Sequence, residues 1–269
     1  MLTFKDLGLE PNLIQAVEDL GFETPTDVQK ESIPLLLNNQ TDLVALAQTG
    51  TGKTAAFGMP LLQKIDSNSK HTQGLILSPT RELCIQITKE IQTYAKHMPK
   101  VNIVAVYGGA NIQDQSKKIK KGAQIIVATP GRMQDMQRRR MVDIKKIDYC
   151  ILDEADEMLN MGFYEDIITI LSEAPKGKNT WLFSATMPPN VAKIAKKFMN
   201  SPKEITVGSK NSGAKNVSHE FYTVSGRQRF EALKRLVDAH PTIFGCIFCR
   251  TKRDTQKVAD NLIESGYNA

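Results

Sequence analysis

The chain has 269 residues, of which 41% are hydrophobic and 24% are charged, a composition typical of an ordinary globular protein. The sequence has no run of eighteen apolar residues and no basic-then-apolar amino terminus. It therefore predicts neither membrane insertion nor secretion, and we expect a cytoplasmic protein. The formal net charge is +6, and residues 208–269 are the more basic part, with ten Lys and Arg against six Asp and Glu. A mild excess of cations suits a polyanionic partner but is also typical of a solvated surface.

Short apolar runs alternate with longer amphipathic patterns along the first two hundred residues. The amphipathic patterns predict helices over 25–37, 81–97 and 189–198. Such alternation is typical of a doubly wound parallel sheet of the α/β class, which binds its ligands beyond the carboxyl ends of the strands. The apolar runs predict strands over 43–47, 74–78, 101–107, 124–128, 149–153 and 180–184.

A change of composition after Val207 predicts a domain boundary. Residues 208–216 are small and polar, as expected of a linker between a first domain, 1–207, and a second that begins at 217. The segment 217–269 predicts strands near 219–224 and 242–248 and helices near 227–239 and 252–265. Two strands and two helices cannot close a doubly wound sheet of normal size, so we expect the second domain to be incomplete.

The pair Cys246 and Cys249 has a spacing that also occurs in metal and redox sites. On the strand predicted here, however, positions three apart face opposite sides, so the two sulfurs would point away from each other. We therefore predict buried, reduced thiols rather than a metal site.

A glycine-rich loop follows the first predicted strand and precedes a helix. Its glycines would let backbone amides turn toward phosphates, Lys53 would reach the terminal phosphates, and the Thr54 hydroxyl would bind Mg²⁺. Ala47 stands where this type of loop usually has its first glycine, but the close approach depends most on the two later glycines. The nucleotide-binding residues predicted in this loop are Gln48, Thr49, Gly50, Thr51, Gly52, Lys53 and Thr54.

Acidic residues stand at the carboxyl end of the strand predicted over 149–153. Asp153 can hold the magnesium ion, and Glu154 can orient and deprotonate the attacking water. An acidic cluster is by itself more often the solvated start of a helix, and it is the phosphate loop that makes the catalytic interpretation strong.

The tetrad Asp153-Glu154-Ala155-Asp156, taken with the loop 47–54 and with Ser184-Ala185-Thr186, resembles the DEAD-box family of ATP-dependent RNA helicases. The resemblance covers essentially the whole chain. It implies a RecA-like doubly wound parallel sheet of the P-loop NTPase class, followed by the start of a second RecA-like domain. It also implies that ATP and Mg²⁺ are the cofactors and that the loops after several strands grip RNA. The RNA-binding residues that it implies are Pro79, Thr80, Arg81, Gly108, Gly109, Thr129, Pro130, Gly131 and Arg132.

The segment from Gly21 to Gln29 resembles the part of the family that reads adenine. The amide of Gln29 offers a donor beside an acceptor, which matches adenine and not guanine. Phe22 would stack on the base, with Phe4 as the upstream aromatic. Without the resemblance, both phenylalanines would be interpreted as core residues.

Ser184 and Thr186 follow a predicted strand, so their hydroxyls should lie beside Asp156 if the two strands are neighbours. The family uses this contact to couple the state of ATP to the grip on RNA, although a simple turn cap would also place hydroxyls there. Residues 247–252 resemble the start of an RNA-facing loop in the family's second lobe.

The implied function is an ATP-driven enzyme that binds single-stranded RNA or short duplexes through phosphate and ribose, with weak sequence selectivity. Two alternatives remain, a related DNA-unwinding enzyme and an RNA clamp that does not hydrolyse ATP. The family carries its arginine fingers in the later part of the second lobe. We therefore expect the 269 residues to be a fragment without full helicase activity.

Two basic runs, Lys117 to Lys121 and Arg138 to Arg140, also suggest contact with nucleic acid. Most such runs are solvated faces of helices, and this interpretation is favoured here.

Overall fold

The computed structural model describes residues 2–38, 41–207, 218 and 220–269. It divides into two compact units, Met1–Lys215 and Asn216–Ala269, which are described separately. The linker predicted over 208–216 lies outside the described residues.

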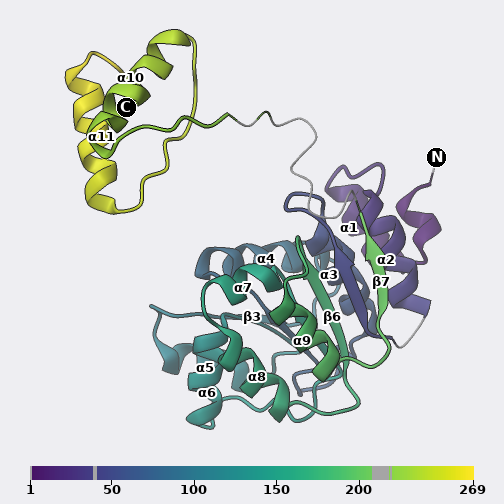
Figure 1. The fold of residues 1–269 in the computed structure, drawn as a ribbon. Coiled ribbons are helices and arrows are strands. Elements are labelled where there is room, and N and C mark those ends of the chain that lie inside the picture. The colour runs from purple at the N-terminus through teal and green to yellow at the C-terminus, as the bar shows by residue number, and fades with distance from the viewer. Residues whose placement is uncertain (1, 39–40, 208–217, 219) are drawn as a thin grey trace. The chain divides into compact units, whose positions relative to one another are not determined.

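The first unit is built on a seven-stranded sheet in the order β3-β4-β2-β5-β6-β1-β7 (Figure 1). All six strand pairs are parallel. This confirms the predicted α/β fold with its doubly wound parallel sheet. The strands are β1 (Leu43–Leu46), β2 (Gly74–Leu77), β3 (Ile103–Val106), β4 (Ile125–Ala128), β5 (Tyr149–Leu152), β6 (Asn179–Ser184) and β7 (Lys203–Thr206).

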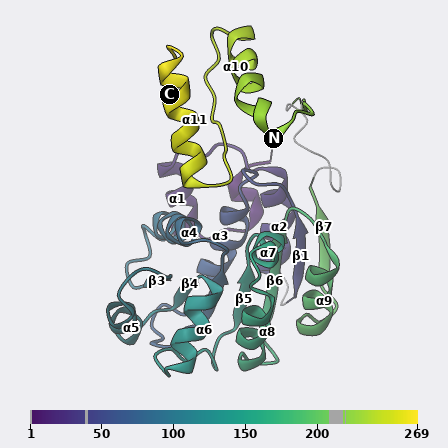
Figure 2. The ribbon, with the colours of Figure 1, turned by 60° about the vertical axis from the view of Figure 1, so that its left-hand side comes forward.

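Helices cover both faces of the sheet (Figure 2), because successive strand residues point to opposite sides and both sides are apolar. In β1, Leu43 and Ala45 belong to one core cluster, while Val44 and Leu46 belong to the other. The first cluster is closed by η1 (Phe4–Leu7), α1 (Pro11–Asp19), α2 (Asp27–Asn38), α3 (Lys53–Lys64) and α4 (Arg81–Tyr94). The second is closed by α5 (Ile112–Lys120), α6 (Pro130–Arg138), α7 (Ala155–Asn160), α8 (Tyr164–Glu173) and α9 (Pro189–Phe198).

The strand order decides which loops meet at the carboxyl edge. The loops after β3, β4 and β2 share one half of this edge, and those after β5, β6 and β1 share the other. Every residue set that the sequence singled out as functional in this unit follows one of these strands, except the segment around Gln29.

The edge strand β7 was not predicted from the sequence. It reads Lys-Glu-Ile-Thr and is largely exposed, so it lacks the apolar run by which the other strands were recognised. Its pairing with β1 is a tertiary interaction, with Ala45 opposite Ile205.

The second unit differs from its prediction. It contains η2 (Gly226–Gln228), α10 (Arg229–Ala239) and α11 (Lys252–Glu264), whereas the segments 220–224 and 243–248, predicted as strands, are irregular. A strand needs a hydrogen-bonded neighbour, and no described residue of this unit supplies one. Phe244 and Phe248 are consequently exposed. The prediction of buried thiols is wrong for Cys246, which is exposed, and for Cys249, which is partly exposed; Cys84 and Cys150 are buried.

None of the helices in the described part of the chain is long and apolar enough to cross a membrane.

At the amino-terminal edge of the sheet, opposite the carboxyl edge, Asp42 connects three strands. It lies directly before β1. Its Oδ1 accepts a hydrogen bond of 2.6 Å from the amide of Thr180 at the start of β6, and its Oδ2 accepts one from the amide of Asn200 ahead of β7. The Asp42 side chain is buried, so water cannot easily take its place as the acceptor for these two amides.

We expect Asp42→Ala to lower the free energy of unfolding by about 2–4 kcal/mol, because it leaves two backbone amides without their charged acceptor. Urea unfolding of the 269-residue chain measures this loss. Asp66→Ala is the matched control, since the Asp66 carboxylate accepts a bond from the Asn68 amide at an exposed site and its removal should cost about 0.5 kcal/mol or less. Equal losses for the two variants would contradict the role assigned to Asp42.

Candidate functional site

The loop between β1 and α3 has the conformation that a phosphate-binding loop requires. Gly50 and Gly52 have φ values of 75° and 86°, a region that other residues enter at a cost. The Thr51 hydroxyl donates to the carbonyl of Gln48 over 2.8 Å and closes the turn. Gly52 then caps the amino terminus of α3, where free backbone N–H groups and the helix dipole favour an anion.

Lys53 and Asp153 are buried charged groups in the site, with only 6% and 3% of their surfaces exposed. Lys53 begins α3, and Asp153 follows β5. Within the described residues they are the only charged side chains that have a buried polar atom without a hydrogen-bond partner, Nζ in Lys53 and Oδ1 in Asp153. Burial raises the pKa of Asp153 to about 7, and the charge of Lys53 acts in the opposite direction.

Glu154 has a left-handed backbone, with φ 50° and ψ 52°, at the position that caps α7. A non-glycine residue pays roughly 1–2 kcal/mol for this conformation. The strained turn leaves Asp153 buried while Glu154 is partly exposed beside it. Two consecutive carboxylates therefore lie in different environments, one dry and one open to water.

Asp156 joins the end of β5 to the end of β6. Its Oδ2 accepts hydrogen bonds from the amide and the hydroxyl of Thr186, over 2.9 and 2.7 Å, and its own amide donates to Ser184 Oγ over 3.2 Å. Burial opposes ionisation, but the hydrogen bonds from Thr186 and Ser184 outweigh it and hold the pKa of Asp156 below its usual value. The structure thus brings together the three residues that the sequence predicted as a coupling set.

Gln29 lies in α2 and contacts the phosphate loop directly. Its Oε1 accepts a bond of 2.9 Å from the Thr26 amide, and its Nε2 donates to the Gly52 carbonyl over 3.1 Å. A side chain on Gly52 would collide with the Gln29 amide. Beside this segment Phe22 is 42% exposed and stacks on the buried Phe4, with ring centroids 6.3 Å apart.

The residues predicted to bind RNA occupy the loops after β2, β3 and β4. Thr80 caps α4 by accepting a bond from the Leu83 amide, and Gly109 takes a positive φ of 81°. Arg132 reaches from α6 to the loop after β3, where its guanidinium donates to the Ala110 carbonyl over 2.9 Å. Thr129 is tied to the same region through its amide, which donates to the Val106 carbonyl. Pro79, Pro130 and Gly131 complete these loops, with both prolines buried.

Two residues that the sequence analysis did not select support this half of the site. The Arg81 guanidinium lies over the ring of Tyr107, 5.1 Å from its centroid. Gln115 is buried, donates to the Tyr107 carbonyl and accepts a bond from Arg132. Tyr107 could have been selected from the sequence, because it stands directly before Gly108. Nothing in the local sequence indicated Gln115.

The described residues contain no group of three or more His, Cys, Asp and Glu side chains that could hold a metal. Mg²⁺ commonly takes one or two protein oxygens and completes its shell with phosphates and water. Thr54 and the buried carboxylate of Asp153 fit that donor set.

Known proteins are similar to this chain in both sequence and fold. The sequence model of the DEAD/DEAH box helicase family matches residues 26–194. The ATP-dependent RNA helicase DeaD of Escherichia coli is 45% identical over 267 residues, which are 99% of this chain and 42% of that protein. The DEAD-box ATP-dependent RNA helicase CshA of Bacillus cereus is 44% identical over 269 residues, or 51% of its length. The chain thus spans about half the length of these curated relatives.

The crystal structure of a DEAD box protein from Methanococcus jannaschii superposes with a TM-score of 0.73 and 41% sequence identity, covering 99% of this chain and 71% of that one. This likeness identifies the seven-stranded sheet as RecA-like. The family match spans residues 26–194, a range that contains the loops after β1 to β6 described above. The chain therefore belongs to the DEAD/DEAH box helicase family.

Proposed function

We propose that this chain binds ATP with Mg²⁺, grips RNA, and takes part in ATP-dependent unwinding of short RNA duplexes. The observation that carries the proposal is that Lys53 and Asp153, beside a glycine loop, are buried and that each has a polar atom without a hydrogen-bond partner. Such groups are costly in a folded protein unless a ligand completes them. The names of the relatives, which describe ATP-dependent RNA helicases, support the same function.

In this proposal each residue of the nucleotide half has one task. The amides of Gln48 to Gly52 and the ammonium of Lys53 bind the phosphates, while Thr54 and Asp153 hold the magnesium ion. Bound Mg²⁺ neutralises charge on the phosphates. Glu154, open to water beside the dry Asp153, orients the attacking water and accepts its proton.

The base is read by the segment around Gln29. An amide has two donor hydrogens and two acceptor lone pairs, and the contacts with Thr26 and Gly52 use one of each. One donor and one acceptor therefore remain for the edge of adenine. The exposed ring of Phe22, supported by Phe4, stacks on the base.

RNA lies along the other half of the edge, on the loops after β2, β3 and β4. Backbone amides, threonine hydroxyls and arginines suit phosphate and ribose rather than base edges, so sequence selectivity is weak. Asp156 follows β5, Ser184 ends β6 and Thr186 follows it, and β5 also pairs with β2, whose loop belongs to the other half. They couple the nucleotide to the RNA.

We infer that residues 217–269 begin a second RecA-like domain, joined to 1–207 by the linker 208–216. The division of the chain near residue 215 supports this inference. We also propose that the protein acts on RNA in the cytoplasm.

The function is tested by measuring phosphate release from ATP by the full-length protein with RNA, with DNA and with neither. We expect stimulation by RNA alone, and Glu154→Gln should slow hydrolysis roughly 10²–10⁴-fold with ATP affinity nearly unchanged, because the shape stays and the base is lost. Glu157→Gln, one turn into the same short helix, is the control and should keep the activity. Equal stimulation by DNA would favour a DNA-unwinding enzyme, and RNA binding without turnover would favour a clamp.

Gln29→Ala should reduce the discrimination between ATP and GTP by more than it reduces affinity for ATP, since the phosphate contacts remain. Titration of each nucleotide into the purified chain gives the ratio of the two affinities. Gln63→Ala is the control, because Gln63 also bridges two backbone groups, the Glu10 amide and the Gly8 carbonyl, away from the loop. A Gln29 variant that rejected GTP as firmly as the wild type would show that this residue does not read the base.

The raised pKa of Asp153 makes the stability of the nucleotide-free chain depend on pH. Because the folded pKa of about 7 lies above the ordinary value of 3.8, the folded chain binds the extra proton, and stability falls as the pH rises between these values. Asp153→Asn removes this penalty, so its stabilisation relative to wild type should be larger at pH 8 than at pH 5 by about 2–3 kcal/mol. Urea unfolding at both pH values, without nucleotide or Mg²⁺, measures the difference. A stabilisation by Asp153→Asn that did not change between the two pH values would contradict the assignment.

A further inference from the structure

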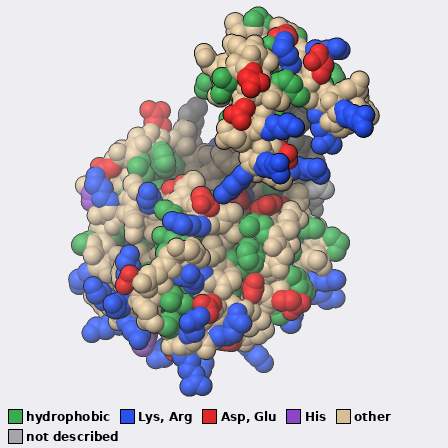
Figure 3. Space-filling view, turned by 90° about the vertical axis from the view of Figure 1, so that its left-hand side faces the viewer, with side chains coloured by type: hydrophobic (Ala, Val, Ile, Leu, Met, Phe, Trp, Pro, Cys, Tyr) green, Lys and Arg blue, Asp and Glu red, His purple; other side chains and the backbone are tan. Residues whose placement is uncertain are grey.

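The two basic runs of the sequence, which the proposed function does not use, belong to one surface. A groove of about 840 Å³ lies between the segments that contain them. Its cationic rim consists of Lys70, Lys120, Arg140, Lys145 and Lys146, with His71 beside Lys146; we call this set the basic groove. Figure 3 shows Lys and Arg side chains gathered over the lower part of the large body, at the height where Figure 1 draws α5 and α6.

The basic groove lies at the opposite edge of the sheet from the proposed ATP and RNA loops. Residues 70–72 precede β2, residues 119–121 precede β4, and residues 140–146 precede β5. In a parallel sheet these segments all lie at the amino-terminal edge. The groove therefore cannot be an extension of the strand-end loops at the carboxyl edge.

The cations of the groove are not neutralised by the protein. Among the described residues, none of the five rim cations forms an ion pair with a carboxylate. The groove also has two acidic residues, Asp143, which accepts a bond from the Lys145 amide, and Glu173, which accepts one from Gln137, so five cations outnumber two carboxylates. All five rim cations are exposed to solvent.

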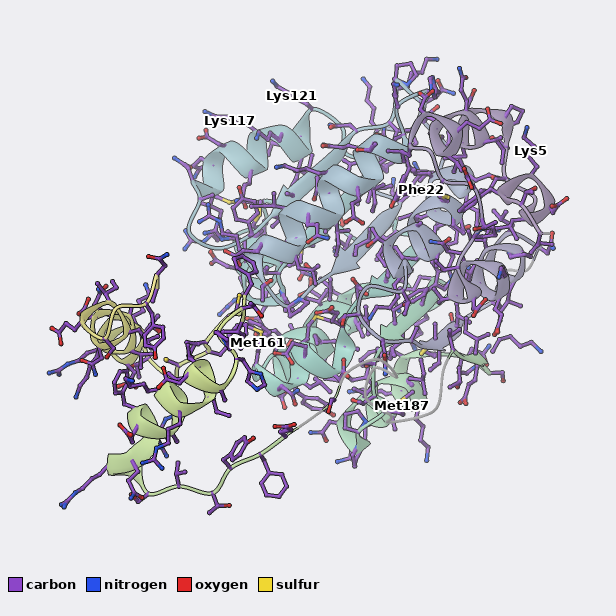
Figure 4. All side chains as sticks on the ribbon, turned by 90° about the horizontal axis from the view of Figure 1, so that it is seen from above. Lys5, Phe22, Lys117, Lys121, Met161 and Met187 are labelled. Carbon is purple, nitrogen blue, oxygen red and sulfur yellow. The ribbon has the colours of Figure 1, made fainter. Side chains whose placement is uncertain are left out.

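Helix dipoles explain only part of this arrangement. Lys117, Lys118 and Lys120 lie in the last turn of α5, where cations are favourable, and Lys117 and Lys121 point outward from that helix in Figure 4. Lys70, Lys145 and Lys146, however, come from loops that precede strands, where no helix terminus calls for a cation.

Arg140 is placed with unusual geometry. It follows α6 in a Schellman turn, with its amide bonded to the Gln137 carbonyl and the Met141 amide bonded to the Met136 carbonyl. Its φ of 54° is the conformation for which glycine is the usual residue at this position. Arg140 thus places a guanidinium on the rim at a position where the backbone conformation favours glycine.

We propose that the basic groove binds the phosphate backbone of an RNA segment other than the one held at the carboxyl edge. This rests on the proposed function, in which the chain already handles RNA. Cations converge from three separate segments, and the partly exposed Ile119, Met141 and Val142 also line the groove. The convergence of exposed cations suits a polyanion bound without regard to sequence.

The experiment compares two variants of the 269-residue chain that lose the same charge. Lys70→Gln, Lys120→Gln and Lys145→Gln together remove part of the rim, while Lys193→Gln, Lys196→Gln and Lys197→Gln together remove three exposed lysines of α9. Affinity for a labelled oligouridylate is measured without nucleotide at several salt concentrations, after thermal melting shows that both variants fold.

The groove variant should bind roughly tenfold more weakly, and the slope of log K against log salt should fall by about 2, since each lost contact to single-stranded RNA removes about 0.7. The α9 variant should keep the wild-type slope. Ultraviolet cross-linking of the wild-type chain should label peptides that contain residues 70–72, 119–121 or 140–146.

Several results would overturn the proposal. Equal loss in both variants would show a general effect of charge. Cross-links confined to the carboxyl edge, with an unchanged slope in the groove variant, would reject the basic groove and leave the proposed function intact. Absence of any RNA binding would contradict both. Polyglutamate that bound more tightly than RNA, with the same dependence on the groove lysines, would identify a site for acidic protein segments instead.

Discussion

The parallel pairing of β5, β6 and β1 is the constraint on which the site depends. Its register places Leu46 opposite Ser184 and Leu152 opposite Leu182, so the three strands reach the carboxyl edge nearly in step. The pairing continues beyond the strand ends, where the Ala47 amide donates to the Ser184 carbonyl and the Asp153 amide donates to Leu77. The phosphate loop, the acidic tetrad and the hydroxyls after β6 therefore have fixed positions relative to one another, although they come from three separate segments of the chain.

The loops after β1 and β5 contain groups whose surroundings are energetically unfavourable in the free protein. Lys53 and Asp153 are buried with polar atoms unpartnered, and Glu154 has a strained backbone. Each feature costs stability in the free protein, and the large two-sided core of the sheet offsets that cost. The loops after β2 and β4 are different, because Arg81 and Arg132 already have protein partners in the Tyr107 ring and the Ala110 carbonyl. The loops after β1 and β5 thus carry buried polar atoms without hydrogen-bond partners, while the arginines after β2 and β4 are held by protein groups.

The two edges of the same sheet also differ in their chemistry. The carboxyl edge presents glycine turns, hydroxyls and a few fixed charges, which suit a ligand held in one geometry. The amino-terminal edge presents solvated lysines around the basic groove and is held together by the buried carboxylate of Asp42. Cations on flexible side chains suit a polyanion that need not be held in a single register. A parallel sheet keeps these two surfaces apart because all of its strands run in one direction.

The sequence by itself determined the α/β class, six of the seven strands, the family and the residues of the strand-end loops, because these follow from local apolar runs and from short motifs. It could not determine that Gln29 lies against Gly52, that Gln115 supports Arg132, or that Lys70 and Lys145 meet the run at Lys120, since these contacts depend on the order of strands in the sheet. The strand β7 was missed because only its pairing with β1 makes a polar segment extended. The strands expected over 219–224 and 242–248 failed for the converse reason: their apolar patterns are present, but in the described residues no neighbouring strand pairs with them. The local sequence pattern indicates which secondary structure a segment can adopt, and tertiary contacts decide whether the segment adopts it.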